Sequence, residues 1–129
     1  MADASSPERD PLTERIIGAA IEVHRHLGPG LLESIYESCI DWELRQRGLD
    51  VARQVAIPVV YKSLRLPDAY RIDLIVEQTA IVEVKAVDRL HPLVGAQVLT
   101  YLKMTGLHTG LILNFNVPLL RDGVKRLVL

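Results

Sequence analysis

Hydrophobic and polar positions follow two different periods along the chain. Before residue 48, apolar side chains recur at spacings of three and four, which predicts two amphipathic helices. After residue 50, short runs rich in Ile, Val and Leu predict strands, and one further stretch of helical period separates them. The predicted order is α-α-β-β-β-α-β with a candidate strand at the end. This order indicates the α/β class, with a mixed β-sheet flanked by helices.

The predicted helices begin and end at residues that suit helix termini. Asp10 can cap the first helix, and Pro11 fits its first position. The apolar face of this helix comprises Leu12, Ile16, Ala20, Val23 and Leu27. Glycines follow all three helices: the first ends at Gly28, the second spans about residues 32–47, and the third about residues 91–105.

Several segments have the composition of strands. They lie at residues 51–62, 70–76, 81–87 and 110–115, with the candidate last strand at residues 124–129. Pro58 lies inside the first of them and predicts an edge strand or a bulge, because proline cannot donate to a ladder. Residues 63–68 are interpreted as a loop.

The register of the predicted hairpin decides whether three charged residues meet. Glu83 and Lys85 share one strand face, and Asp73 lies on the preceding strand. A two-residue turn would put Asp73 on the opposite face, whereas a three-residue loop at residues 77–79 places it opposite Glu83. The sequence Gln-Thr suits a two-residue turn poorly, which favours the longer loop. The alternative is an ordinary half-exposed strand that carries a Glu and a Lys.

Other polar residues stand out beside this hairpin. Glu33 lies in line with the apolar stripe of the second helix, either as a functional carboxylate or as an acid stabilised by the helix dipole. Gln97 and Tyr101 are one turn apart on the third helix, which is also the spacing of an ordinary surface pair. Arg71 shares the predicted face of Asp73 and could contact a substrate phosphate or neutralise the acids.

Length and composition limit the class of protein. The 129 residues suffice for one compact domain, expected at residues 11–129 after a disordered tail at residues 1–10. A single cysteine allows no intrachain disulfide and suits the reducing cytoplasm. The apolar runs are too short for a membrane span, so no membrane partner is expected.

The charge balance argues against a simple basic protein that coats DNA. Lys and Arg total 15 against 16 Asp and Glu, a net charge of −1. Residues 1–50 carry five basic and ten acidic side chains, whereas residues 51–129 carry ten basic and six acidic. The average therefore hides an acidic first part and a basic second part.

The clustered residue types indicate a reaction. Carboxylates that converge on one point bind a hard divalent cation, Mg²⁺ or Mn²⁺ rather than zinc. A lysine beside them can hold or deprotonate the attacking water and offset charge that develops on a phosphate. The set predicts metal-assisted hydrolysis of a phosphodiester.

The order of these residues resembles the PD-(D/E)xK nuclease superfamily. The resemblance is carried, in chain order, by Glu33, Asp73, Glu83, Lys85, Gln97 and Tyr101. Residues 30–36, with the sequence GLLESIY, look like the motif that names the GxxExxY branch of this superfamily. Ile72 stands where the superfamily's name has a proline.

The resemblance implies a restriction-endonuclease-like α/β core and roles for individual residues. The implied metal ligands are Asp73 and Glu83, with Glu33 as a further acid at the metal and Lys85 as the catalytic lysine. The supporting or substrate-binding candidates are Gln97, Tyr101, Arg71 and Tyr36. The expected cofactor is Mg²⁺, for which Mn²⁺ can substitute.

We therefore expect a metal-dependent nuclease that acts on DNA rather than RNA. Two alternatives stay open: hydrolysis of a different phosphoester, and a catalytically inactive nucleic-acid-binding or protein-interaction module on the same fold. A homodimer is expected, because a domain with one site cuts both strands of a duplex most simply as a symmetric pair.

Overall fold

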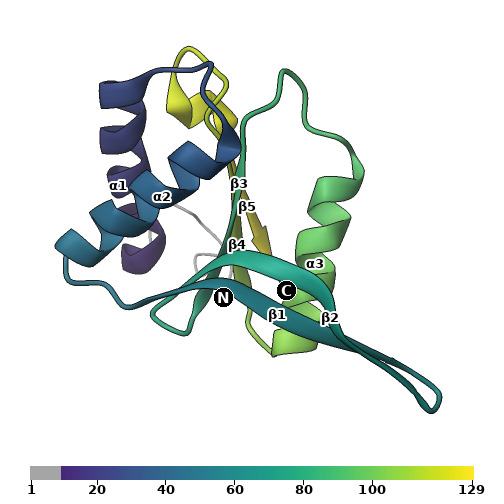
Figure 1. Cartoon of the computed structure of the whole chain (residues 1–129). Coiled ribbons are helices and arrows are strands. Elements are labelled where there is room, and N and C mark those ends of the chain that lie inside the picture. Colours follow the sequence, from purple (N-terminus) through teal and green to yellow (C-terminus); the bar gives the residue numbers. More distant parts are fainter. Residues whose placement is uncertain (1–9) are drawn as a thin grey trace.

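The computed structural model describes residues 10–129, in which three α-helices surround one β-sheet (Figure 1). The helices are α1 (Pro11–Leu27), α2 (Glu33–Gln46) and α3 (Leu93–Thr105). The strands are β1 (Val51–Tyr61), β2 (Leu64–Val76), β3 (Ala80–Lys85), β4 (Thr109–Asn114) and β5 (Val124–Val128), and a 3-10 helix, η3 (Leu120–Gly123), precedes β5. Residues 1–9 of the predicted tail lie outside the described residues. Within residues 10–129 no helix is long and apolar enough to cross a bilayer.

The sheet is mixed and its strands lie in chain order, β1-β2-β3-β4-β5. Strands β3 and β4 are parallel, and the other neighbours are antiparallel. Helix α3 makes the crossover between the two parallel strands and covers one face of the sheet, while α1 and α2 cover the other (Figure 1). The predicted α/β class with a mixed sheet is confirmed, including the last strand.

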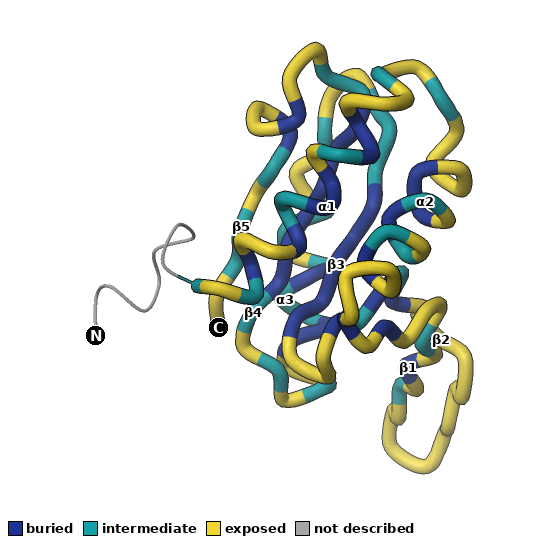
Figure 2. Tube along the Cα trace, turned by 90° about the vertical axis from the view of Figure 1, so that its left-hand side faces the viewer, coloured by how far each residue is buried: buried dark blue, intermediate teal, exposed yellow. Residues whose placement is uncertain are grey.

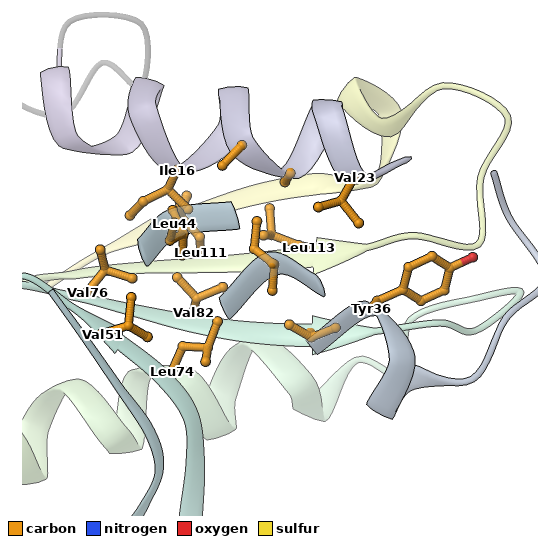
Figure 3. Close-up of a cluster of buried hydrophobic side chains, with 14 of the residues drawn as sticks. Ile16, Val23, Tyr36, Leu44, Val51, Leu74, Val76, Val82, Leu111 and Leu113 are labelled. Atoms are coloured by element: carbon orange, nitrogen blue, oxygen red, sulfur yellow. The ribbon is translucent and has the colours of Figure 1, made fainter. Parts of the chain in front are cut away.

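Two apolar clusters hold the layers together. The larger lies between the sheet and helices α1 and α2, where Ile16 and Leu44 meet Val82 and Leu111 (Figure 3). The smaller lies between the sheet and α3 and contains Ile57, Ile72, Ile81, Tyr101 and Leu102. Burial is concentrated in the central strands and in the helix faces turned to them (Figure 2). This core fixes the positions of the strands that carry the candidate site.

The predicted start of the first helix is confirmed. The Asp10 carboxylate accepts hydrogen bonds from the backbone N–H groups of Leu12 and Thr13, at 3.1 and 3.3 Å. These bonds satisfy donors that have no partner within the helix. Asp10 also lies 3.3 Å from the Arg126 guanidinium on β5, so the cap ties the start of the helix to the far edge of the sheet.

The predicted loop at residues 63–68 is wrong, because β1 and β2 pair almost to the end of the hairpin. Tyr61 pairs with Leu64, which leaves Lys62 and Ser63 as the turn. Pro67 suggests a loop, but it lies with Pro58 where the register shifts and no ladder hydrogen bond is needed. The bulge predicted at Pro58 is confirmed.

The register of the β2–β3 hairpin agrees with the three-residue loop. Val76 pairs with Ala80, and Glu77 and Gln78 adopt positive φ values of 54° and 53° in the loop between them. Counted from the loop, the last pair of the ladder is Leu74 with Val82, so Asp73 is the first residue of β2 beyond the ladder. This ending leaves the Asp73 carboxylate available for other contacts.

Candidate active site

Asp73, Glu83 and Lys85 lie together where β2 and β3 separate. The Asp73 carboxylate accepts a hydrogen bond of 2.8 Å from the backbone N–H of Val84, in place of a further ladder bond. On β3 the Lys85 ammonium lies 3.7 Å from Glu83 Oε2. The hairpin thus brings together the acids and the lysine that the sequence singled out.

The local cause is a change in the face that β2 buries. Ile72 belongs to the cluster beneath α3, whereas Leu74 belongs to the cluster beneath α1 and α2. Side chains two residues apart in a regular strand would point to the same face. Asp73 lies between these two residues, so its carboxylate occupies the point where the strand changes faces.

Burial and mutual repulsion dominate the electrostatics of the two carboxyl groups. Burial raises the pKa of Asp73 to about 6, and the charge of Glu37 acts in the same direction. The hydrogen bond from the Val84 N–H and the charge of Lys85 act in the opposite direction and lower this pKa. Burial raises the pKa of Glu83 to about 7, with the charge of Asp73 acting in the same direction and Lys85 acting against it. Glu83 Oε1 is buried and has no hydrogen-bond partner among residues 10–129. An oxygen in this state is a ready acceptor for a cation or a proton.

Tyr101 borders these carboxylates from helix α3. Its pKa is raised to about 12, first by burial and then by the charges of Glu83 and Asp73. Its ring meets that of Tyr70 edge to face, with the centroids 5.6 Å apart. Gln97, one turn away, lines a surface pocket together with Tyr70. The two residues of the predicted pair therefore have different surroundings: Tyr101 lies beside the acids, and Gln97 lines the neighbouring surface pocket.

Glu33 lies at the edge of the site. Its side chain is exposed, and Oε2 is 3.4 Å from the backbone N–H of Ala86, just beyond β3. Its charge contributes to the raised pKa of Glu83. This position is compatible with a further acid beside the site. The side chain is exposed at the start of α2, however, and lacks the apolar surroundings that the helix stripe led us to expect.

Glu37 is the acid that sequence reasoning missed. The residue is buried, with 9% of its surface exposed. Arg53 Nε donates to Glu37 Oε2 at 2.8 Å, and the Gln54 side-chain amide donates to both carboxylate oxygens at 3.0 and 2.9 Å. The available signal was geometric, since Glu37 lies one turn after Glu33 and only about 40° around the helix from it.

Gln54 connects this acid to Asp73. The amide that donates to Glu37 also lies 3.4 Å from Asp73 Oδ1. Gln54 has a φ of 54°, a left-handed conformation that costs a residue other than glycine roughly 1–3 kcal/mol. The ladder of β1 and β2 omits the pair of Gln54 and Asp73, so both strands are irregular beside the site.

Arg71 does not neutralise the acids. Its guanidinium lies 3.9 Å from Asp68 and 3.4 Å from the backbone oxygen of Gln54, and within residues 10–129 it forms no ion pair with Asp73 or Glu83. Its exposed side chain remains available for a substrate.

Tyr36 makes its polar contacts with the turn between α1 and α2. Its hydroxyl donates to the Gly28 carbonyl at 2.5 Å and accepts from the Leu31 N–H at 3.2 Å, and its ring stacks on Phe115. The residue closes the turn between α1 and α2 and supports the core (Figure 3). The motif at residues 30–36 therefore combines one acid near the site with one structural tyrosine.

The donor chemistry fits a divalent cation held by few protein ligands. Among residues 10–129 no group of three or more His, Cys, Asp and Glu side chains is arranged to hold a metal ion. Asp73 and Glu83 supply two carboxylates that repel each other, and Glu83 has a buried oxygen that no described residue satisfies. Mg²⁺ is commonly bound by one or two carboxylates, with water and substrate phosphate as the other ligands.

Comparison with known proteins identifies a family for the chain. The family model described as PD-(D/E)XK nuclease superfamily matches residues 10–127, which is nearly the whole chain. No curated protein and no solved structure matches it. The mixed sheet with helices on both faces is consistent with the restriction-endonuclease-like core of that superfamily. The chain therefore belongs to the PD-(D/E)XK nuclease superfamily.

Proposed function

We propose that this protein is a divalent-metal-dependent nuclease that hydrolyses phosphodiester bonds, in DNA in preference to RNA. One observation carries the proposal: Glu83 Oε1 is buried with no hydrogen-bond partner among residues 10–129, beside a second desolvated carboxylate and a lysine. Leaving a buried carboxylate oxygen without a hydrogen bond is costly, and a bound cation would remove the cost. Membership of a nuclease superfamily also supports a nuclease function.

Asp73 and Glu83 would hold Mg²⁺, or Mn²⁺ in its place, with Glu33 as a further acid at the edge. When bound, the cation polarises the phosphate and lowers the pKa of a coordinated water. A divalent cation would offset the repulsion between the two carboxylates that contributes to the raised pKa of Glu83, and its binding near neutral pH would displace the proton from this carboxyl group.

The other side chains would act directly on the substrate. The Lys85 side chain is 23% exposed, so its ammonium can donate to a phosphate oxygen while it remains beside Glu83. The pKa of Tyr101, raised to about 12, lies far above neutral pH, so its hydroxyl keeps its proton and can act as a donor. Gln97 lines a surface pocket and Arg71 is exposed, so both side chains could contact the backbone of a bound substrate.

Three finer assignments accompany the proposal. The GLLESIY segment at residues 30–36 favours the GxxExxY branch, with Glu33 as the branch's characteristic acid. A homodimer would supply two sites for the two strands of a duplex. The single cysteine, Cys39, is unpaired within the chain and is compatible with the cytoplasm.

Cleavage and metal binding test the proposal separately. The protein is incubated with single-stranded, duplex and branched DNA and with RNA, in Mg²⁺ or Mn²⁺. We expect cleavage by the wild type, and a loss on the order of 100-fold for Lys85→Ala, because one donor to the reacting phosphate is removed. Lys103→Ala, which changes an exposed lysine near the end of α3, is the matched control.

The thermal stability of the same variants separates catalysis from metal binding. Mn²⁺ should raise the melting temperature of the wild type and of Lys85→Ala, but not that of Glu83→Gln. A wild type that cuts none of the substrates contradicts the nuclease. If Mn²⁺ also leaves its melting temperature unchanged, the alternative of a non-catalytic binding module is favoured.

A further inference from the structure

The outer part of the β1–β2 hairpin, residues 57–71, extends beyond the sheet as a two-stranded arm (Figures 1 and 2). Nearly all of its residues are exposed, although it contains large apolar side chains. The exposed apolar residues are Val60 (60%), Tyr61 (62%), Leu64 (54%), Leu66 (44%) and Tyr70 (37%). A two-stranded ribbon that packs on nothing else is marginally stable in water. An exposed apolar face on such a ribbon therefore indicates an interaction site.

Most of these apolar side chains share one face. Tyr61 pairs with Leu64 and Val59 with Leu66, and paired residues in an antiparallel ladder point the same way. The same face continues to Tyr70, whose ring touches Tyr101 beside the carboxylates. The apolar stripe therefore runs from the end of the arm to the candidate active site.

The arm also carries cations with weak or no carboxylate partners. Among residues 10–129, Arg65 forms no ion pair, and Lys62 lies over the ring of Tyr61 at 5.3 Å. Arg71 is 3.9 Å from Asp68, and both side chains are exposed. Asp68 is the only acid at residues 57–71, against three basic residues. By contrast, several arginines of the helical part have carboxylates at 2.5 to 2.8 Å.

We propose that the arm binds nucleic acid with unpaired bases. Tyr61 and Leu64 pack on exposed base faces, while Lys62 at the turn and Arg65, which pairs with Val60 on the opposite face of the ribbon, contact phosphates of a strand that passes around the arm. Phosphates would provide the negatively charged partners for the cations of the arm, whereas a second copy of the arm would bring positive charges together. Unpaired bases offer flat faces for aromatic and aliphatic contact, whereas stacking hides those faces in a duplex.

This inference rests on the proposed function, since it assigns a substrate class to the same site. Strand β2 continues from Arg65 through its register shift to Asp73, and the apolar stripe ends at Tyr70 against Tyr101, so a strand bound along the arm is directed to the carboxylates. The surface selects unpaired regions, and the carboxylates and Lys85 act on the strand delivered there. Binding by the arm needs no metal, which allows the two proposals to fail independently.

Equilibrium binding in EDTA tests the arm without cleavage. Fluorescence anisotropy measures the affinity for a labelled 20-nucleotide single strand and for the same sequence as a duplex. The charge variant combines Lys62→Gln with Arg65→Gln, and the apolar variant combines Tyr61→Ser with Leu64→Ser. The control combines Lys103→Gln with Arg121→Gln, which removes two exposed charges outside the arm. Circular dichroism checks that every variant is folded.

The wild type should prefer the single strand. The charge variant should reduce the slope of log K against log salt by roughly 1.4, because two phosphate contacts to a single strand are lost. The apolar variant should weaken single-strand binding on the order of 10-fold and leave duplex binding unchanged. The control should bind as the wild type does.

Three results would overturn the inference. They are equal affinity of the wild type for the two probes, wild-type binding by both arm variants, and dissociation of a dimer by the apolar variant with unchanged affinity for DNA. The last result would assign the stripe to a second copy of the chain. Single-strand binding by the arm without any cleavage in Mg²⁺ or Mn²⁺ would sustain the inference and contradict the nuclease.

Discussion

Glu83 should destabilise the folded protein at neutral pH when no divalent metal is present. Its pKa rises from 4.5 to about 7 on folding, chiefly because the side chain is buried. Between these pH values the folded state binds more protons than the unfolded state, so stability falls as pH rises. The penalty is almost absent near pH 4.5 and complete near pH 8, where it amounts to roughly 3 kcal/mol at about 1.4 kcal/mol per tenfold change in proton affinity.

The variant Glu83→Gln removes this penalty. Urea unfolding in EDTA gives the free energy of unfolding of both proteins at pH 4.5 and at pH 8. The variant loses the Lys85 ion pair, whose N–O distance is 3.7 Å and whose contribution is at most about 1 kcal/mol. We therefore expect Glu83→Gln to be about 2–3 kcal/mol more stable than the wild type at pH 8, and nearly equal to it at pH 4.5.

Glu14→Gln is the matched control, because Glu14 is an exposed carboxylate on α1. It should change stability by less than about 0.5 kcal/mol at either pH. If Glu83→Gln shows no gain at pH 8 over pH 4.5, the Glu83 carboxylate is neither desolvated nor repelled, and the electrostatic account of the site is refuted. Mg²⁺ at pH 8 should stabilise the wild type and leave the variant unchanged.

Other predictions concern the packing that supports the site. Gly123→Ala should cost more than about 3 kcal/mol in chemical unfolding, because the new methyl group would overlap the Asn114 carbonyl oxygen. Gly95→Ala should stabilise the protein by about 0.5–1 kcal/mol, since it lies in α3 and its methyl group would meet only the Lys125 ammonium, at 3.6 Å. Tyr36→Phe should lower stability by about 1–2 kcal/mol in the same assay without reducing nuclease activity, because the lost hydroxyl serves Gly28 and Leu31 rather than the carboxylates.

The hairpin that carries the acids could be predicted because its constraints are local. Strand faces alternate strictly, and a loop of three residues fixes the pairing of Val76 with Ala80. Only one register brings Asp73 to Glu83, and the structure has that register. The sequence did not indicate that the ladder stops at Leu74, because this depends on the Asp73 side chain bonding to Val84.

The arm was missed for the opposite reason. Pro67 and Asp68 are typical of turns, and nothing nearby in the sequence shows that residues 64–66 pair with residues 59–61. The pairing bypasses the prolines through a change of register. Local turn signals therefore mark the bulge rather than the end of the strand.

The acid that α2 buries is not the one that the helical periodicity indicated. Helical periodicity places Glu33 in line with the apolar stripe, but Glu33 is the first residue of α2 and is exposed. Glu37 lies one turn further in, where Arg53 and Gln54 of β1 meet it. The identity of the buried acid depends on where β1 crosses the helix, which is a tertiary property that periodicity does not contain.

Unfavourable features gather in one small region of this fold. Gln54 adopts a left-handed backbone conformation, Glu83 Oε1 is buried with no hydrogen-bond partner in the described part of the chain, and Asp73 and Glu83 repel each other. Each feature lowers stability, and a single substitution would remove each. A chain constrained only to fold would have no reason to place them together, whereas a cation and a phosphodiester supply the charges and contacts that they lack. The concentration of strain, desolvation and repulsion around Asp73 is therefore an argument for chemistry at this position that does not depend on family membership.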